Sequence, residues 1–294
     1  MTHIAFIGIG AMGEPMAANL LRKGYAVTAV KHRRTESASR LQALGARIAA
    51  TPAEAAQGCD LALLSLPTSR EVEEVIEGTN GLLGGAAPGT VVVDCSTSTP
   101  DSTRRLAALL EQRGMTLIAA GMTRGVQGAK QGTLAFFVGG PRAALDKAQP
   151  VLRAMGDTFV EFPAAADAHA AKLISNVLSY GTVALVNEAL MLGTKSGVDP
   201  KTLFDALMHG APSKALESFG PRIITGEYQP PRVTVGHVCE DMVLAQALAA
   251  GVAAPIFMLA TAQEIYRLSA SQGHAGRDLS IIAELWRNAV RSKS

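Results

Sequence analysis

The stretch Phe6-Ile7-Gly8-Ile9-Gly10-Ala11-Met12-Gly13 follows a short apolar run and opens a helical segment. It contains the pattern Gly-x-Gly-x-x-Gly in the strand–turn–helix context that this pattern requires. Gly8 permits the tight turn, Gly10 lets the backbone approach a pyrophosphate, and Gly13 lets the helix pack closely on the strand. Because a helix N-terminus attracts anions, the stretch predicts a dinucleotide site. Its expected contacts are Gly8, Gly10, Ala11, Met12 and Gly13, and the alternative is a glycine-rich turn without a ligand.

The end of the second predicted strand indicates which dinucleotide fits. An Asp or Glu about 20 residues further on would hold a ribose 2′-hydroxyl. Here that position is Lys31, and it is followed by His32, Arg33 and Arg34. Basic side chains suit a 2′-phosphate, which a guanidinium binds with two parallel hydrogen bonds. We therefore expect NADP(H) to be preferred and NAD(H) to be possible, with Arg33 or Arg34 as the main contact. A solvated basic turn is the alternative.

Short β-branched runs alternate with helical segments from residue 3 to about residue 163. The runs that predict strands are Ile4–Ile9, Val27–Val30, Leu61–Leu66, Val91–Asp94, Thr116–Ala119, Leu134–Val138 and Phe159–Phe162. Strands that are continuously apolar and separated by helices are typical of a parallel sheet covered on both faces. This part of the chain therefore predicts the α/β class, with a doubly wound and mostly parallel Rossmann sheet.

Capping residues mark where several helices begin. Thr51-Pro52-Ala53-Glu54 is a capping box with proline at the first helical position. Thr99-Pro100 repeats the combination before a helix expected to run to Gly114, and Asp199-Pro200 does so in the second half of the chain. Each pair predicts a helix that starts at its proline.

Strand patterns stop near residue 164, and helical periodicity then spans Ala165–Ser196, which is longer than a typical globular helix. The remainder is helical in pattern, with Gly/Pro breaks near residues 210–212, 229–231 and 251–255. We expect two domains joined by the long interdomain helix. They are a dinucleotide-binding Rossmann domain at residues 1–163 and an all-α substrate and oligomerisation domain at residues 164–294.

The composition excludes several classes of protein. With 294 residues, 48% of them hydrophobic and 18% charged, the chain is neither disordered nor collagen-like. A net charge of +2 lacks the basic excess of a nucleic-acid binder, and 4% aromatic residues argue against stacking platforms for single strands. We therefore expect no nucleic-acid partner.

Cysteine usage and hydropathy favour a cytoplasmic protein without a membrane partner. Cys59, Cys95 and Cys239 are too scattered for a disulfide framework or a zinc cage. The N-terminal apolar run lacks a basic region before it, so no signal peptide is expected. Residues 242–263 carry no formal charge, but Gly251 and Pro255 interrupt them and predict a turn between two helices rather than a transmembrane span.

Residues 6–20, which continue the glycine pattern as Met12-Gly13-Glu14-Pro15-Met16, resemble the signature of the β-hydroxyacid dehydrogenase family. That family includes proteins like 3-hydroxyisobutyrate dehydrogenase and tartronate semialdehyde reductase. The resemblance covers nearly the whole chain and recurs at Leu66-Pro67, at Asp94-Cys95-Ser96-Thr97 and at residues 125–134. It implies an enzyme that interconverts a small β-hydroxyacid and its semialdehyde with a nicotinamide cofactor. It also implies cofactor contacts from Leu66, Pro67 and Thr97.

The family's catalytic pattern, Lys-x-x-x-Asn on the interdomain helix, is matched by Lys172 and Asn176. Residues four apart lie on one face of a helix, so the ammonium and the amide are neighbours. Hydride transfer to a carbonyl carbon builds negative charge on the oxygen, which an ammonium stabilises and protonates. The resemblance therefore implies Lys172 as general acid/base, with Asn176 beside it and in contact with the substrate. A solvated helix face is the alternative.

The expected substrate loop departs from the family pattern Asp-Ala-Pro-Val-Ser-Gly-Gly. The equivalent residues 119–125 keep a hydroxyl at Thr123 and a bare amide at Gly125, while Arg124 replaces a glycine. We expect Ser96, Thr123, Arg124 and Gly125 to bind the substrate's anionic end, with Arg124 as a two-pronged clamp. An Arg124 side chain turned to solvent is the alternative.

Two further departures concern the helices. His169 stands three residues before Lys172, where it either reaches the substrate or caps or packs the helix. The family's Lys-Asp pair appears as Glu240-Asp241. The resemblance implies a cofactor contact for Asp241, whereas Glu240 either binds a polar group of the substrate or pairs with Arg124 or Lys172.

We expect a small anionic carbonyl or hydroxyacid substrate, no metal, and a homodimer or homotetramer. His237-x-Cys239 has no second pair of ligands and predicts no metal site. The rival readings are an imine reductase, a decarboxylating sugar-acid dehydrogenase, and a catalytically silent dinucleotide-binding scaffold. Retention of the lysine argues against the imine reductase, and the short helical half argues against the sugar-acid enzyme.

Overall fold

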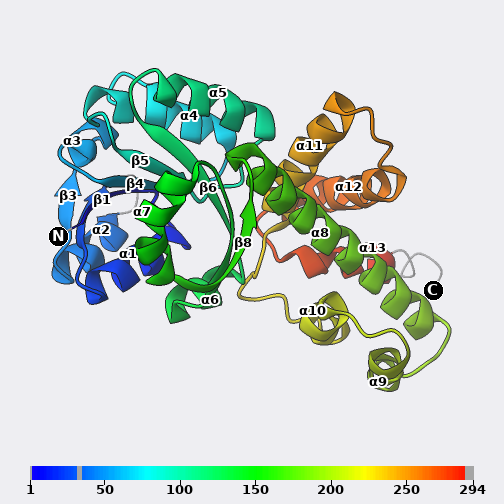
Figure 1. The fold of residues 1–294 in the computed structure, drawn as a ribbon. Helices are drawn as coiled ribbons and strands as arrows, with labels where there is room; N and C mark the ends of the chain where they lie inside the picture. The colour runs from blue at the N-terminus through cyan, green and yellow to red at the C-terminus, as the bar shows by residue number, and fades with distance from the viewer. Residues whose placement is uncertain (1, 32–34, 289–294) are drawn as a thin grey trace. The chain divides into compact units, whose positions relative to one another are not determined.

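Within the residues that the computed structural model describes, 2–31 and 35–288, eight strands form one sheet in the order β3-β2-β1-β4-β5-β6-β7-β8 (Figure 1). The strands are β1 (His3–Ile7), β2 (Ala26–Val30), β3 (Arg47–Ala49), β4 (Leu61–Leu64), β5 (Val91–Asp94), β6 (Thr116–Thr123), β7 (Leu134–Gly139) and β8 (Gly156–Phe162). All neighbours are parallel except β6 and β7, which are antiparallel. The predicted mostly parallel sheet is confirmed.

Helices cover both faces of the sheet because alternate side chains of each strand point to opposite faces. Ile4 and Phe6 of β1 belong to one core, and Ala5 and Ile7 belong to the other. The helices that pack into the first core are α1 (Gly13–Arg22), α2 (Thr35–Ala43), α6 (Gly125–Gln131) and α7 (Arg142–Arg153). Those that pack into the second are α3 (Pro52–Ala56), α4 (Ser69–Glu77) and α5 (Pro100–Glu111), joined by the short turn η1 (Leu82–Gly84).

The predicted helix starts are confirmed by the caps themselves. The hydroxyl oxygen of Thr99 accepts a hydrogen bond from the Ser102 amide at 3.3 Å at the start of α5. Thr51 accepts one from the Glu54 amide at 3.1 Å, while the Glu54 carboxylate accepts one from the Ala50 amide at 2.8 Å. These contacts satisfy amide groups that have no partner inside the first helical turn.

Sequence patterns missed one strand and ended another early. β3 has three residues and lies at the sheet edge, where it pairs with β2, so it has too few residues to show a periodic pattern. β6 continues past the predicted end at Ala119 to Thr123, because its last five residues pair with β7. This extension brings Gly121 and Thr123 into the sheet.

The second half of the chain is helical, as predicted. Its helices are α8 (Ala165–Lys195), α9 (Pro200–Gly210), α10 (Lys214–Thr225), α11 (Val235–Gly251), α12 (Phe257–Ser269) and α13 (Ala283–Asn288), with short helical turns η2 (Ala270–His274) and η3 (Leu279–Ile282). Asp199 caps α9 by accepting a hydrogen bond from the Thr202 amide at 2.8 Å. The break predicted near residues 251–255 separates α11 from α12.

The chain divides into two compact units, residues 1–172 and residues 173–294, and the division falls inside α8. The sequence places the boundary earlier, at residue 163, because strand patterns end there. The first turns of α8 belong to the first unit since Ala165 and Ala168 pack against Ala119 of β6. One continuous helix thus begins on the sheet and ends in the helical unit.

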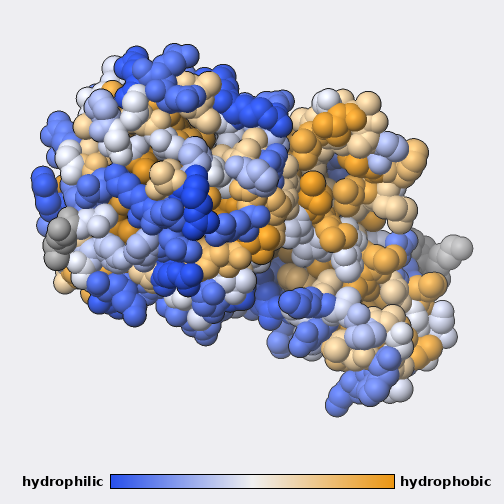
Figure 2. Space-filling model, in the orientation of Figure 1, coloured by the Kyte–Doolittle hydropathy of each residue, from blue (hydrophilic) through white to orange (hydrophobic). Residues whose placement is uncertain are grey.

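Apolar side chains on α8 remain exposed in the second unit. Leu178, Leu185 and Leu192 are 65%, 59% and 69% exposed. Figure 2 shows apolar residues gathered over the helical part of the chain. Among the described residues, α8 is also the one helix long and apolar enough to span a bilayer by length and composition, a test that core helices of soluble proteins pass as well.

Candidate active site

The carboxyl ends of neighbouring strands carry the predicted site residues of the first unit. Gly8 follows β1, Leu66 and Pro67 follow β4, and Ser96 and Thr97 follow β5. Thr123 is the last residue of β6. Because β1, β4, β5 and β6 are adjacent and parallel, these residues meet at one edge of the sheet. In doubly wound sheets, ligands bind at this edge, near the point where the strand order reverses.

The loop between β1 and α1 is shaped to receive a phosphate group. A Cβ atom added at Gly8 would lie 2.1 Å from the carbonyl oxygen of Ser65, and one added at Gly13 would lie 1.9 Å from the carbonyl oxygen of Gly8. A Cβ added at Gly10 would meet nothing within 4 Å. Gly8 and Gly13 therefore close the loop, and Gly10 faces open space near the N-terminus of α1. These residues fit a dinucleotide.

The predicted basic segment starts at Lys31, directly after β2, where its amide donates to the Ala49 carbonyl at 2.9 Å. His32, Arg33 and Arg34 lie outside the described residues. α2, which follows them, is tied to α1 because the Glu14 carboxylate accepts hydrogen bonds from Ser37 Oγ at 2.6 Å and from Arg40 Nε at 2.6 Å. The Arg40 hydrogen bond lowers the pKa of Glu14.

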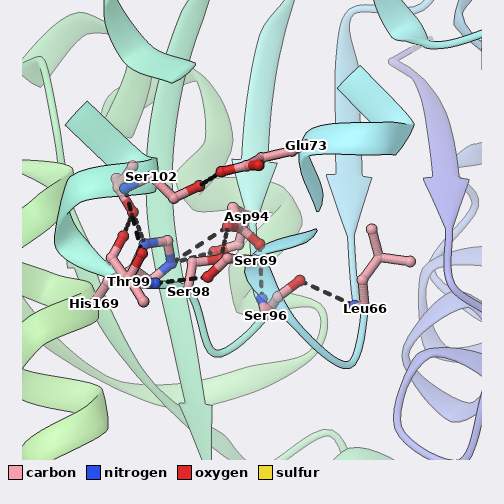
Figure 3. A network of polar contacts seen from close by, with 10 residues as sticks. Leu66, Ser69, Glu73, Asp94, Ser96, Ser98, Thr99, Ser102 and His169 are labelled. Atoms are coloured by element: carbon pink, nitrogen blue, oxygen red, sulfur yellow. Dashed lines mark hydrogen bonds and ion pairs between the residues drawn. The ribbon is translucent and has the colours of Figure 1, made fainter. Parts of the chain in front are cut away.

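A buried carboxylate organises the loop after β5 (Figure 3). Asp94, which is 1% exposed, accepts hydrogen bonds from the Ser96 amide at 2.9 Å and from Ser98 Oγ at 2.6 Å. The Ser96 hydroxyl oxygen in turn accepts a hydrogen bond from the Leu66 amide at 3.0 Å. Ser96 thus links the loops after β4 and β5. Its amide donates to Asp94 and its hydroxyl oxygen accepts from Leu66, so neither hydrogen bond uses the hydroxyl proton.

Lys172 lies on α8 with its stem over β6. A Cβ atom added at Gly121 would lie 2.9 Å from both Cβ and Cγ of Lys172, and the lysine is 9% exposed. The lysine stem therefore runs across the backbone of the strand that ends at Thr123. Sequence reasoning overlooked Gly121, although a lone glycine inside a strand signals a close approach of another group.

The Arg124 side chain forms hydrogen bonds within the protein. Its φ of 77° is left-handed, and its guanidinium donates to Asp157 Oδ1 at 2.6 Å, to Thr158 Oγ1 at 2.8 Å and to the Thr133 carbonyl at 2.6 Å. The Thr158 hydroxyl and the guanidinium lower the pKa of Asp157. The Arg124 guanidinium, which was expected to bind the substrate, is thus hydrogen-bonded to residues of β8 in this conformation. Thr123 and Gly125 flank Arg124 at the end of β6 and the start of α6.

In the second unit, Asp241 of α11 is buried and bound to α8. Its Oδ2 accepts hydrogen bonds from Asn176 Nδ2 at 2.8 Å and from Tyr180 Oη at 2.9 Å. Burial and the Asp241 charge raise the pKa of Tyr180. In this arrangement the Asp241 carboxylate holds the amide of Asn176, and the cofactor contact expected for Asp241 stays a prediction. Tyr180 was overlooked, although its position four residues after Asn176 places both on one helix face.

Glu240 lies near a residue that its predicted alternatives did not include, whereas His169 fits one of its two predicted alternatives. Glu240 Oε2 lies 3.8 Å from Nδ1 of His237, whose Nε2 lies 3.6 Å from Asp241 Oδ2. His169 is fully buried, with Nδ1 2.7 Å from Thr103 Oγ1. Of the two readings for His169, substrate contact or packing of the helix, its surroundings in the first unit correspond to the second.

Comparison with known families matches both halves of the chain. Residues 3–163 match a model described as the NAD binding domain of 6-phosphogluconate dehydrogenase. Residues 166–286 match a model described as NAD-binding of NADP-dependent 3-hydroxyisobutyrate dehydrogenase. Together the two matches account for most of the chain.

Individual proteins are similar over nearly the full length. The NAD-dependent L-serine dehydrogenase of Pseudomonas aeruginosa is 36% identical, covering 97% of this chain and 98% of that protein. The 3-hydroxyisobutyrate dehydrogenase of the same organism is 34% identical, covering 98% and 99%. A structure of Mycobacterium tuberculosis 3-hydroxyisobutyrate dehydrogenase with L-serine has a TM-score of 0.89 and 30% identity, covering 98% of this chain and 99% of that chain.

Proposed function

The chain belongs to the β-hydroxyacid dehydrogenase family, and on that premise we propose that it is an NADP(H)-preferring oxidoreductase of small β-hydroxyacids and their semialdehydes. The observation that carries this proposal is the position of Lys172 over Gly121 of β6. Gly121 lies two residues before the end of β6, the strand next to β5 in a sheet whose carboxyl edge also bears the glycine-rich loop. The proposed proton donor and the glycine-rich loop thus belong to one compact unit.

The preference for NADP(H) is supported by Lys31, which stands where a family member selective for NAD(H) would carry an acidic residue. We propose Arg33 or Arg34 as the 2′-phosphate contact. Replacing both by Ala should weaken NADPH far more than NADH, as measured by fluorescence titration. Equal weakening of both cofactors would contradict the proposal.

We assign the remaining cofactor contacts to the edge of the sheet. Gly10 lies at the N-terminus of α1, whose free amides attract a pyrophosphate. Leu66 and Pro67 follow β4, which neighbours β1 in the sheet, and Thr97 follows β5, the next strand beyond β4. The bound cofactor supplies or accepts a hydride, and the chain's residues position it and handle the proton.

Lys172 is the proposed general acid/base. In the reducing direction its ammonium donates a proton to the carbonyl oxygen as negative charge grows there. In the oxidising direction the neutral amine takes the proton of the substrate hydroxyl. Asn176, one turn further along α8, is held by Asp241 and is proposed to orient the substrate beside the lysine.

Hydroxyls and amides hold the anionic end of the substrate in this proposal. Ser96 has a hydroxyl proton available in the loop after β5, and Thr123 and Gly125 offer a hydroxyl and a main-chain amide after β6. Arg124 binds the substrate together with these groups only when its guanidinium leaves Asp157 and donates to the substrate instead. Glu240 is proposed to meet a polar substituent of the substrate.

The proposal is tested by NADPH consumption with a panel of carboxylate, sulfonate and phosphate semialdehydes. Lys172→Ala should abolish turnover while NADPH still binds, and Lys195→Ala, at the exposed end of the same helix, should behave as wild type. No turnover with any aldehyde, in a protein that binds NADPH, would favour the silent scaffold. Turnover confined to cyclic imines would favour the imine reductase.

A homodimer or homotetramer is supported by the exposed face of α8. Leu178, Leu185 and Leu192 recur every seven residues, the spacing at which one helix packs along another. We propose that a second copy of the chain covers them. Leu185→Glu should lower the mass measured by light scattering, whereas Leu268→Glu, on α12, should not. An unchanged mass for Leu185→Glu would contradict this interface.

We propose a cytoplasmic location. It is supported by free thiols at Cys59, Cys95 and Cys239, two of which are buried. Detection of the native protein in a membrane or secreted fraction would contradict it.

A further inference from the structure

A cluster of polar side chains is buried where the first turns of α8 meet the loop after β5 (Figure 3). His169 is 0% exposed, and Asp94 and Thr103 are 1% exposed. Apart from His169 and the exposed Asp167, the residues of α8 before Lys172 are alanines. His169 is therefore the polar anchor of this end of the helix.

Both ring nitrogens of His169 are engaged. Nε2 lies 3.3 Å from the main-chain carbonyl of Asp94, and Nδ1 lies 2.7 Å from Thr103 Oγ1. A carbonyl oxygen only accepts, so Nε2–H donates to the Asp94 carbonyl. Nδ1 shares a hydrogen bond with Thr103 Oγ1, which also lies 2.9 Å from the Thr99 carbonyl, so the single Thr103 hydroxyl proton goes to one of these two acceptors at a time. One side chain thus links α8 to both β5 and α5.

Further contacts connect His169 to Ser96, which is expected to bind the substrate. The Asp94 carboxylate lies 3.7 Å from Nε2 of His169 and accepts hydrogen bonds from the Ser96 amide and Ser98 Oγ. Ser96 then accepts from the Leu66 amide. His169 is therefore connected through Asp94 to the loop that is proposed to hold the substrate's anionic end.

We propose that His169 is a positioning residue for Lys172. The inference rests on the proposed role of Lys172 as general acid/base. Residues three apart share a helix face, so His169 and Lys172 point to the same side of α8. The lysine stem lies over Gly121, and the histidine fixes the rotation of the helix one turn earlier.

Hydrogen bonds are needed here because the apolar contacts are small. Ala165 and Ala168 pack against Ala119, and beside these three methyl groups the cluster holds only the partly buried Phe162. Apolar contacts have no preferred direction, so a cluster this small does little to prevent the helix from sliding or turning. Directed hydrogen bonds to Asp94 and Thr103 oppose both motions. Displacing a catalytic group by about 1 Å is enough to lower a rate about 100-fold.

The test compares His169→Leu with His169→Gln. Leucine removes both polar atoms, whereas the glutamine amide can still donate to the Asp94 carbonyl. We expect His169→Leu to lower kcat about 10- to 100-fold, with KM and the NADPH Kd within about twofold of wild type. His169→Gln should recover at least about tenfold of this loss. Thr103→Val, which keeps the side-chain volume, provides a second variant should His169→Leu fail to fold.

The chain offers a matched control in the same unit. His3 Nε2 lies 2.8 Å from Thr28 Oγ1 at the amino-terminal edge of the parallel strands, opposite the edge that carries Ser96. His3→Leu removes a histidine–threonine contact that is part-buried rather than buried, and it should leave kcat unchanged. An equal loss of kcat in His3→Leu would overturn the inference, because general destabilisation would then explain both results.

Two further outcomes separate this inference from the proposed function. Wild-type kcat in His169→Leu, together with an inactive Lys172→Ala, would overturn the inference alone. A raised KM with unchanged kcat would also overturn it. An active Lys172→Ala would refute the proposed function itself.

Discussion

The stem of Lys172 lies directly over the backbone of Gly121, at a distance that leaves no room for another carbon. A Cβ atom at Gly121 would lie 2.9 Å from both Cβ and Cγ of the lysine and 3.6 Å from its Cδ. The crowded atoms are the base of the side chain, which cannot move without moving α8. The glycine thus sets where the proposed proton donor leaves its helix.

Gly121→Ala should lower kcat about 10- to 100-fold, because the lysine stem must shift to admit the methyl group. Cofactor affinity should be unchanged, since the glycine-rich loop follows a different strand. Steady-state kinetics and NADPH titration check both expectations. Gly210→Ala is the control, since a Cβ there meets nothing within 4 Å. Wild-type kcat in Gly121→Ala would contradict the prediction.

Two glycines of the phosphate loop should respond differently to alanine. A methyl group at Gly10 meets no protein atom, so Gly10→Ala should fold normally and weaken NADPH binding about tenfold or more, because it occupies the space meant for the pyrophosphate. Gly13→Ala would place a carbon 1.9 Å from the Gly8 carbonyl oxygen and should lower Tm. Thermal unfolding and NADPH titration separate the effects, and equal Tm values for both variants would contradict this assignment.

Arg124→Gly should change the KM for a carboxylate substrate by less than about threefold. The guanidinium is bound by Asp157, Thr158 and the Thr133 carbonyl, and a hydrogen bond from a charged group to the substrate would contribute more, about 1.5–3 kcal/mol. Stability should stay within about 1 kcal/mol, since glycine relieves the left-handed backbone of Arg124 while an exposed ion pair is lost. A rise in KM above about tenfold would mean that the guanidinium leaves Asp157 for the substrate.

Glu14→Gln should slightly lower the free energy of unfolding at neutral pH, because it removes the ion pair with Arg40. The Arg40 hydrogen bond lowers the pKa of Glu14 below its ordinary value of 4.5. The stabilisation is therefore complete above that value and is lost as the pH falls through the lowered pKa. Urea unfolding should show the difference between variant and wild type shrinking in acid, and a constant difference would contradict this.

Most of the fold could be predicted because its signals are local. A threonine or aspartate before Pro52, Pro100 or Pro200 starts a helix through a contact three residues away. Continuous apolar runs mark strands buried on both faces. The sequence did not predict β3, because three residues at a sheet edge are too few to show a periodic pattern. It did not predict the end of β6, because those residues pair with β7 through contacts that are not local.

The candidate site shows the same difference between local signals, which the sequence reveals, and contacts between distant segments, which it does not. Spacing alone placed Lys172 and Asn176 on one helix face, and the glycine pattern alone indicated a phosphate loop. The partners of individual side chains depend on segments that only folding brings together. Arg124 turns to Asp157, 33 positions away in the chain, and His169 binds Thr103, 66 positions away. Local rules cannot choose among such partners, because burial and hydrogen-bond geometry select them only after the sheet and α8 have packed.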